Sequence, residues 1–434
     1  MAAILLIYPQ PDEIKQRRFG FSLNLLYLSS ILKQAGHTIT AYLDYSIERF
    51  DPNPLHPLLV SSEIVIIEFD AFPLKRSINI PHAETLVKRI KTEHPSKKII
   101  VFGYDFSLFQ RELEYADLTL PAEPEANILA AIDHVTGKNT EPFILRQLEH
   151  PDLLPFPDRS LLTPFAETGG AVDQEPHLAP STLIETARGC PGNCIFCQRK
   201  GWQTRMRSHS VDYVVCEFTE LQQKKYKNIW VTDDNFTFDL KRAKEILKRF
   251  TSSGVTQGMK IALSSWTHID REFLRLARDA GVSIISFGVE TAEPTILEFY
   301  QKKIDLEAFQ RLISSADELG LYTVGNFILG APMETEETID KTFAYIMETP
   351  FDRINLKILD YMAGSQLYER LTPELRSSRR HVFACQENGL NEFPFQYLKQ
   401  RINRFQNRFR LACETRLKRK MERFGPPYYS DFGF

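Results

Sequence analysis

Short β-rich runs alternate with helical stretches along the first 133 residues, and this alternation restricts the folds open to the chain. The runs predict five strands, at residues 4–8, 38–43, 64–69, 98–102 and 118–120, with helices near 23–35 and 83–92. Strands separated by helices favour a parallel sheet with helices on both faces. We therefore expect an α/β, Rossmann-like doubly wound domain over residues 1–140, with any ligand at the carboxyl ends of its strands.

A second alternating series begins near residue 181 and runs to about residue 371. Its expected strands are residues 182–187, 228–232, 260–264, 283–289, 322–329 and 353–359. Six parallel strands with helices between them are typical of a partial (βα)6, TIM-like barrel, whose carboxyl-end face carries the chemistry. Seven prolines between Pro142 and Pro180 predict a proline-rich linker over residues 141–180.

Residues 372–434 are expected to form a basic helical C-terminal region. Between Tyr397 and Phe424 there are ten Lys or Arg and two acidic residues. Apolar residues recur there at helical spacing: Ile402, Phe405, Phe409, Ala412 and Met421. We expect one packed and one solvated face; contact with a phosphate-bearing substrate, an acidic protein or RNA is the alternative. The aromatic tail beyond Phe424 is expected either to cover a cavity or to lie disordered.

Bulk composition excludes several classes of protein. The chain has 434 residues, of which 43% are hydrophobic and 25% charged, so a disordered or fibrous polymer is excluded. A net charge of −3 gives no general attraction to nucleic acid or to an anionic membrane. The apolar run at residues 2–8 is too short to span a bilayer and lacks the flanks of a secretory signal. We expect a cytoplasmic protein without a membrane or nucleic-acid partner.

Three of the six cysteines, Cys190, Cys194 and Cys197, form a C-x3-C-x2-C loop directly after an expected strand. A structural zinc site would need a fourth ligand, and neither His177 nor His209 has the spacing of one. A disulfide is a weaker interpretation, because three cysteines cannot pair evenly in a reducing compartment. Soft thiolates suit an iron-sulfur cluster, and three ligands on a four-iron cube leave one iron open.

The loop and its surroundings, ETARGCP at residues 185–191, resemble the radical S-adenosylmethionine (SAM) superfamily. Other segments are similar to its subgroup with an N-terminal B12-binding-type domain: PFPDR at 155–159, DDNFT at 233–237, FGVET at 287–291 and FILGAPMET at 327–335. The resemblance covers roughly residues 1–370, and the order of the motifs makes it specific. It implies that Cys190, Cys194 and Cys197 hold a 4Fe-4S cluster whose open iron binds SAM. Reductive cleavage then gives methionine and a 5'-deoxyadenosyl radical.

Polar residues at the other strand ends supply candidate SAM contacts. Asp233, Asp234 and Asn235 place acceptors where a methionine ammonium could bind, and Glu290 can bridge ribose hydroxyls. Gly330 permits a close approach of adenine to the backbone. Ser265 and His268 are further lining candidates. Phe196 is expected either to meet adenine through its backbone or simply to pack. The sequence identifies no catalytic residue.

Whether the first domain binds cobalamin stays open. No D-x-H-x-x-G motif marks a lower cobalt ligand. Two turns that usually carry paired glycines here read Phe102, Gly103, Tyr104, Asp105 and Leu120, Pro121, Ala122, Glu123, which add bulk. Glu68 and Asp70 add negative charge at the end of the third strand. The alternative is a domain that only packs on the barrel.

The resemblance implies a radical SAM enzyme acting on a small-molecule substrate, with an external one-electron donor such as flavodoxin or ferredoxin. With cobalamin, the expected reaction is C-methylation of a biosynthetic substrate. Without cobalamin, the same barrel could serve an isomerase, dehydratase or oxidase. An iron-sulfur electron carrier or scaffold that binds no SAM is the alternative outside enzymes, but it gives no reason for the ordered strand-end motifs.

Overall fold

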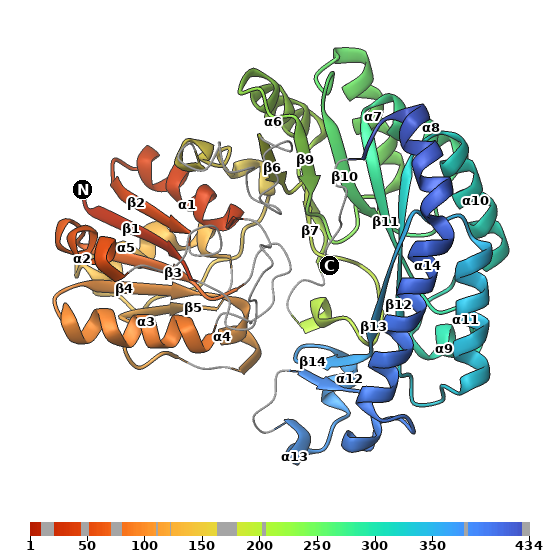
Figure 1. The fold of residues 1–434 in the computed structure, drawn as a ribbon. Helices are drawn as coiled ribbons and strands as arrows, with labels where there is room; N and C mark the ends of the chain where they lie inside the picture. Colours follow the sequence, from red (N-terminus) through yellow and green to blue (C-terminus); the bar gives the residue numbers. More distant parts are fainter. Residues whose placement is uncertain are drawn as a thin grey trace. The chain divides into compact units, whose positions relative to one another are not determined.

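The structure is a computed structural model that describes residues 1–9, 21–44, 52–70, 80–109, 112–121, 123–162, 180–201, 205–376 and 381–427. Residues 163–179 of the predicted linker, Ala122 of the second bulky turn, and the aromatic tail from residue 428 lie outside these ranges. The chain divides into two compact units, Met1–Ile184 and Glu185–Phe434. Figure 1 colours the chain along its sequence, from red at the N-terminus to blue at the C-terminus.

The first unit contains a parallel sheet of five strands in the order β2-β1-β3-β4-β5. The strands are β1 (Ala3–Tyr8), β2 (Thr38–Asp44), β3 (Ile64–Glu68), β4 (Lys98–Phe102) and β5 (Leu118–Leu120). The helices are α1 (Leu23–Gln34), α2 (Pro52–Ser61), α3 (Ile80–Glu93), α4 (Tyr104–Phe109) and α5 (Ile128–Val135). The predicted Rossmann-like class is confirmed. Strand order reverses between β1 and β3, which makes their carboxyl ends the switch point of the sheet.

A buried carboxylate lies at the end of β3, next to this switch point. Glu68 is fully buried and accepts hydrogen bonds from the Ser22 hydroxyl and from Asn24 Nδ2, the latter at 2.7 Å. Burial raises the pKa of Glu68 well above its usual range, although both donors act to lower it. Ser22 also caps α1, since its hydroxyl accepts from the backbone N–H of Leu25 at 2.9 Å. The negative charge expected at this position is therefore disfavoured by burial, and the carboxyl group belongs to a local hydrogen-bond network.

The turn after β4 is closed by side chains of the same unit. A Cβ added at Gly103 would lie 3.0 Å from Phe69 Cβ and 3.3 Å from Asp70 Oδ1. Asp70 Oδ2 accepts a hydrogen bond from the backbone N–H of Tyr104 at 2.9 Å, at the first residue of α4. Gly103 is thus needed for the approach of Phe69 and Asp70.

The second sheet has six strands in the order β13-β12-β11-β10-β9-β6, which apart from direction is their order along the chain. They are β6 (Ser181–Ile184), β9 (Asn228–Val231), β10 (Lys260–Ser265), β11 (Val282–Glu290), β12 (Tyr322–Leu329) and β13 (Arg353–Ile358). The pairs from β9 to β13 are all parallel. The helices that follow them include α6 (Val211–Gln223), α7 (Leu240–Ser253), α8 (Arg271–Asp279), α10 (Leu306–Glu318) and α11 (Glu336–Glu348). The predicted partial (βα)6 barrel is confirmed.

Short polar residues precede the helices α6, α7, α8, α10 and α11 of this unit. The side chain of each N-cap residue accepts a hydrogen bond from a backbone N–H of the first helical turn. These N-cap residues are Ser210, Asp239, Asp270, Asp305 and Thr335. The caps fix where each strand-end loop stops and its helix begins. Small elements complete the unit: β7 (Ala187–Arg188) pairs antiparallel with β8 (Arg207–Ser208), and β14 (Asp360–Met362) with β15 (His381–Phe383).

The two faces of the six-stranded sheet differ in polarity. On one face Phe287 packs edge-on against Phe309 of α10, with ring centroids 5.2 Å apart. On the other face Asn326 donates to Ser286 Oγ at 2.8 Å, and Asn355 Nδ2 donates to Asn326 Oδ1 at 3.0 Å. Because the helices cover the first face, the second face lines the inside of the barrel. A polar ladder therefore crosses three strands of the interior.

The last helix, α14 (Phe395–Phe424), packs along this unit. Its buried residues are Leu398, Ile402, Phe405, Phe409 and Lys420. The rings of Phe405 and Phe343 stack at 3.8 Å between centroids, which joins α14 to α11. Ala412, which the spacing placed on the packed face, is exposed. Three exposed cations of the opposite face are Lys399, Arg404 and Arg408, so the prediction of one packed and one solvated face is confirmed for this helix.

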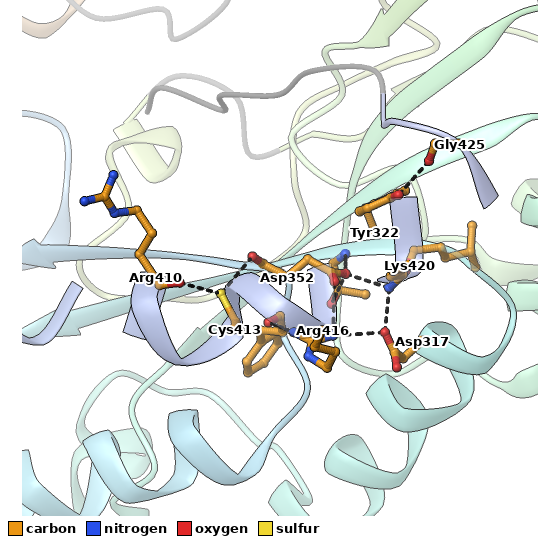
Figure 2. Close-up of polar contacts among 11 residues, drawn as sticks. Asp317, Tyr322, Asp352, Arg410, Cys413, Arg416, Lys420 and Gly425 are labelled. Atoms are coloured by element: carbon orange, nitrogen blue, oxygen red, sulfur yellow. Dashed lines mark hydrogen bonds and ion pairs between the residues drawn. The ribbon is translucent and has the colours of Figure 1, made fainter. Parts of the chain in front are cut away.

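A partly buried ionic network anchors the C-terminal half of α14 (Figure 2). Lys420 Nζ lies 2.7 Å from Asp317 Oδ1 and 2.8 Å from Asp352 Oδ2. Arg416 pairs with the same two carboxylates at 3.0 and 3.1 Å. Lys420 also lies 5.0 Å from the ring centroid of Tyr322. Part of the basic character of this helix therefore serves its own packing.

Candidate active site

The three clustered cysteines lie in a tight loop after β7. Gly192 N donates to Cys190 Sγ at 3.4 Å, and Cys197 N donates to the Cys194 carbonyl at 3.1 Å. A Cβ added at Gly192 would lie 3.3 Å from Cys190 Sγ and 4.0 Å from Cys194 Sγ. The backbone of Gly192 thus lies close to two of the sulfurs, and a side chain there would be tight against Cys190 Sγ.

Burial is the main influence on the thiols. It raises the pKa of Cys190 and of Cys197 to about 11, and it raises the pKa of Cys194 as well. A thiol becomes a ligand only as the thiolate, so bound iron has to displace these protons. Within the described ranges no three His, Cys, Asp or Glu side chains converge on a single ion. Three soft donors in one loop suit a multi-iron cluster, which separates its ligands more widely than one tetrahedral ion does.

An ion pair at the end of β11 lies beside this loop. Lys302 Nζ donates to Glu290 Oε1 and to the Gly288 carbonyl, both at 2.7 Å. A Cβ at Gly288 would lie 2.6 Å from Glu290 Oε1 and 3.0 Å from Lys302 Nζ, so the pair rests directly on this glycine. Glu290 has φ of +71°, and the register of β11 against β12 shifts between Gly288 and Glu290. Such backbone strain in a non-glycine residue gathers at functional sites.

The charge of Lys302 reaches the cysteine loop. Burial alone would lower the pKa of Lys302, but Glu290 and the sulfurs of Cys194 and Cys197 raise it above its usual range. Lys302 in turn favours the thiolate of Cys194. A buried cation is therefore fixed between the predicted ribose ligand and a predicted cluster ligand.

The two aspartates after β9 have different surroundings. Asp233 accepts from the Thr186 hydroxyl and backbone N–H and from Ala187 N, and burial raises its pKa to about 6. Asp234 Oδ1 lies 2.7 Å from Arg199 Nε, two residues beyond Cys197. Asp233 thus ties β7 to the β9 end, and Asp234 holds the turn that follows the cysteines.

Asn235 and Ser265 belong to one hydrogen-bonded network with Thr237 and Trp266. Asn235 Oδ1 accepts from Thr237 N at 3.0 Å and from Trp266 N at 3.2 Å. Ser265 Oγ donates to the Trp266 carbonyl at 2.8 Å and lies 2.8 Å from the Thr237 hydroxyl. Asn235 Nδ2 is buried and, in the described part of the chain, has no hydrogen-bond partner. This amide keeps two N–H groups for a bound molecule.

Phe196 and Gly330 make close contacts of their own. The ring of Phe196 meets that of Tyr300 edge-on, with centroids 5.1 Å apart, while Ile195 N donates to the Tyr300 carbonyl at 3.4 Å. Gly330 has φ of +100°, and a Cβ there would lie 3.0 Å from the Ala384 carbonyl oxygen. Gly330 therefore allows a close approach of Ala384, and the predicted adenine contact stays a prediction.

The structure gathers Asp234 and Glu290 around the cysteine loop through Arg199 and Lys302. Asn235 and Ser265 join the same region through Trp266, whereas His268 is exposed. Sequence reasoning missed Lys302, Arg199 and Trp266. For Lys302, the available signal in the sequence was its position shortly after FGVET.

The profile of the radical SAM superfamily matches residues 184–346, the segment that contains the cysteine loop and all six candidate SAM contacts. Residues 184–346 are a radical SAM domain. The resemblance expected from the motifs is therefore confirmed. A radical SAM domain uses a 4Fe-4S cluster and SAM, and the chain is an enzyme.

The similarity to known proteins and to solved structures extends beyond the radical SAM domain. A protein of Pyrococcus horikoshii named as an uncharacterized methyltransferase is 27% identical over 84% of this chain and 82% of its own length. The cytidylyl-2-hydroxyethylphosphonate methyltransferase of Streptomyces wedmorensis is 28% identical over 51% of this chain and 42% of its own length. The radical SAM methyltransferase TsrM of Kitasatospora setae, solved with cobalamin and a 4Fe-4S cluster, superposes with a TM-score of 0.69 at 17% identity. That superposition covers 87% of this chain and 79% of TsrM, and it establishes the shared fold.

The helices of the described ranges lack the features of a membrane span. None of them combines the length and the apolar character of a membrane-spanning segment.

Proposed function

We propose that this protein is a cobalamin-dependent radical SAM C-methyltransferase that acts on a small biosynthetic substrate. The observation that carries the proposal is the radical SAM domain with its cysteine loop, joined in one chain to a five-stranded sheet of the order 2-1-3-4-5. TsrM superposes over most of both units, and the relatives from Pyrococcus horikoshii and Streptomyces wedmorensis are named as methyltransferases.

In this proposal Cys190, Cys194 and Cys197 hold the cluster. The loop geometry supports it, because two of the sulfurs lie within 4.0 Å of the position that a Cβ would take on Gly192. When bound, the cluster supplies one electron to the sulfonium of SAM. The chain provides a charge-compensated setting for that event through Lys302 and Arg199, whose positive charges favour the thiolates.

The SAM contacts are assigned from free hydrogen-bonding capacity. Glu290 Oε1 is committed to Lys302, which leaves Oε2 for ribose hydroxyls. Lys302 uses two of its three N–H donors within the chain and keeps one for an anionic group. Asn235 Nδ2 offers its two N–H groups from a buried position. We keep Phe196, Asp234, Ser265 and Gly330 as wall and positioning residues of the same site.

The remaining partners follow from this chemistry. An external one-electron donor such as a flavodoxin or ferredoxin has to reduce the cluster, and a reducing compartment, the cytoplasm, keeps the thiols available. The polar ladder of Ser286, Asn326 and Asn355 supports a substrate with hydrogen-bonding groups.

The experiment is anaerobic reconstitution with iron and sulfide, reduction, and an assay for 5'-deoxyadenosine, run with and without hydroxocobalamin during expression. The proposal expects deoxyadenosine and a corrin spectrum after acid release. Deoxyadenosine without corrin would move the protein to the second candidate, a radical SAM isomerase, dehydratase or oxidase. One observation favours that candidate: the turn at Gly103 is filled by Phe69 and Asp70. An iron-sulfur protein without deoxyadenosine would be the carrier or scaffold.

A further inference from the structure

Trp266 lies against the cysteine loop. It directly follows β10, and its Cζ2 lies 3.6 Å from the position that a Cβ would take on Gly192. The same position is 3.3 Å from Cys190 Sγ and 4.0 Å from Cys194 Sγ. The edge of the indole and two of the sulfurs therefore lie around one point beside the backbone of Gly192, the position that a Cβ would take.

Hydrogen bonds fix the backbone of Trp266 on both sides. Its N–H donates to Asn235 Oδ1 at 3.2 Å and to Thr237 Oγ1 at 3.1 Å. Its carbonyl accepts from Ser265 Oγ at 2.8 Å. The exposed fractions of Asn235, Thr237 and Ser265 are 2%, 3% and 5%. These side chains are too buried to reorient freely, so they determine where the indole lies.

We propose that Trp266 is the aromatic wall of the cluster site and that Asn235, Thr237 and Ser265 are positioning residues that act through it. The inference rests on the proposed cluster ligands and goes beyond them, because it assigns the shielding of the cluster to residues that do not bind iron. An indole packed on the loop keeps water from the sulfurs of Cys190 and Cys194. The apolar surroundings of a metal site control its access to solvent and its redox potential.

The direction of the effect follows from charge. Reduction adds one negative charge to the cluster, and water stabilises added charge better than an indole does. Replacing Trp266 by a small residue therefore makes the midpoint potential less negative. It also opens the sulfurs to oxygen and water, and we expect the cluster to be lost in air roughly 10-fold faster.

The experiment compares Trp266→Ala, Trp266→Phe and Thr237→Val with the wild-type chain, all reconstituted anaerobically. Trp230→Phe, within β9, is the matched control. The readouts are the midpoint potential from a spectroscopic redox titration, the decay of the cluster absorbance in air, and the quenching of tryptophan fluorescence on reconstitution. None of them requires substrate or SAM turnover.

We expect a less negative midpoint potential and faster cluster decay for Trp266→Ala, partial recovery for Trp266→Phe, and a smaller shift in the same direction for Thr237→Val. We also expect that replacing Trp266 removes more quenching than replacing Trp230. A potential and an air lifetime equal to wild type in Trp266→Phe, and in Trp266→Ala if that variant folds, would overturn the inference while leaving the cluster assignment intact. A wild-type chain that assembles no four-iron cluster would overturn the proposed function and this inference together.

Discussion

Lys302 and Glu290 form a 2.7 Å ion pair that rests on the Cα of Gly288. Their side chains are only 14% and 9% exposed, and the left-handed backbone of Glu290 turns its carboxylate toward the lysine. The pair links the end of β11 electrostatically to the cysteine loop, because the positive charge of Lys302 favours the thiolate of Cys194.

Lys302→Met should therefore leave a buried carboxylate without its cation. We expect a loss of about 3 to 5 kcal/mol in the free energy of unfolding of the cluster-free protein, measured by urea denaturation. The exposed neighbour Lys303 provides the control, and Lys303→Met should change stability by no more than about 0.5 kcal/mol. Equal stabilities for the two variants would contradict this view of the pair.

The network on α14 makes a similar prediction for the other end of the barrel. Lys420 is 5% exposed and pairs with Asp317 and Asp352, whereas Lys418 is exposed and pairs with Glu414 on the surface. Lys420→Met should cost about 3 kcal/mol or more, whereas Lys418→Met should melt with the wild type because its ion pair is fully exposed. Thermal unfolding followed by circular dichroism measures both. A melting temperature of Lys420→Met equal to that of the wild type would contradict a stabilising role for the network.

The raised thiol pKa values predict slow alkylation of the cluster-free protein. With a pKa of about 11 in place of 9.0, the thiolate fraction of Cys190 and Cys197 at pH 8 is about 100-fold lower than that of an ordinary thiol. Iodoacetamide labelling followed by peptide mass spectrometry should modify the exposed Cys216 first. Labelling of the loop cysteines at the rate of Cys216 would show that their thiols are not buried.

Glu334 predicts a pH-dependent stability. Its carboxylate accepts from the backbone N–H groups of Gly330 and Ala331, yet burial raises its pKa to about 7 from the usual 4.5. The folded state then binds the proton more tightly than the unfolded state, so the stabilisation is complete below pH 4.5 and is lost as the pH rises to about 7. That loss amounts to about 3 kcal/mol.

The measurement is the free energy of unfolding of the wild type and of Glu334→Gln at several pH values. The difference between them should change by about 3 kcal/mol between pH 4.5 and 7. Glu337→Gln, at an exposed position three residues later, should track the wild type throughout. A constant difference for Glu334→Gln would contradict the raised pKa.

The sequence predicted the strands more accurately than the side-chain contacts. Alternating apolar runs bounded by turn residues located all five strands of the first sheet and all six of the second to within a few residues. Helix α2 was missed because Pro57 lies inside it, and α4 and α5 were missed because six and eight residues carry little periodic signal.

The site shows the same division. Spacing within one loop identified Cys190, Cys194 and Cys197, since the three ligands are local in sequence. The partners of Asp234 and Glu290 could not be predicted, because Arg199 and Lys302 reach them through the fold. The strand-end position of Ser265 predicted a residue that lines the site. The structure shows that its hydroxyl donates a hydrogen bond to the Trp266 carbonyl, which the sequence could not predict.

The most direct test of the account is electron paramagnetic resonance of the reduced, reconstituted protein before and after SAM is added, together with iron analysis. We expect about four irons per chain and a cluster signal that changes on SAM addition, because SAM binds the iron without a cysteine. Cys194→Ala should lose this SAM-responsive signal while Cys216→Ala retains it. A signal unaffected by SAM, or bound zinc in place of iron, would contradict the account.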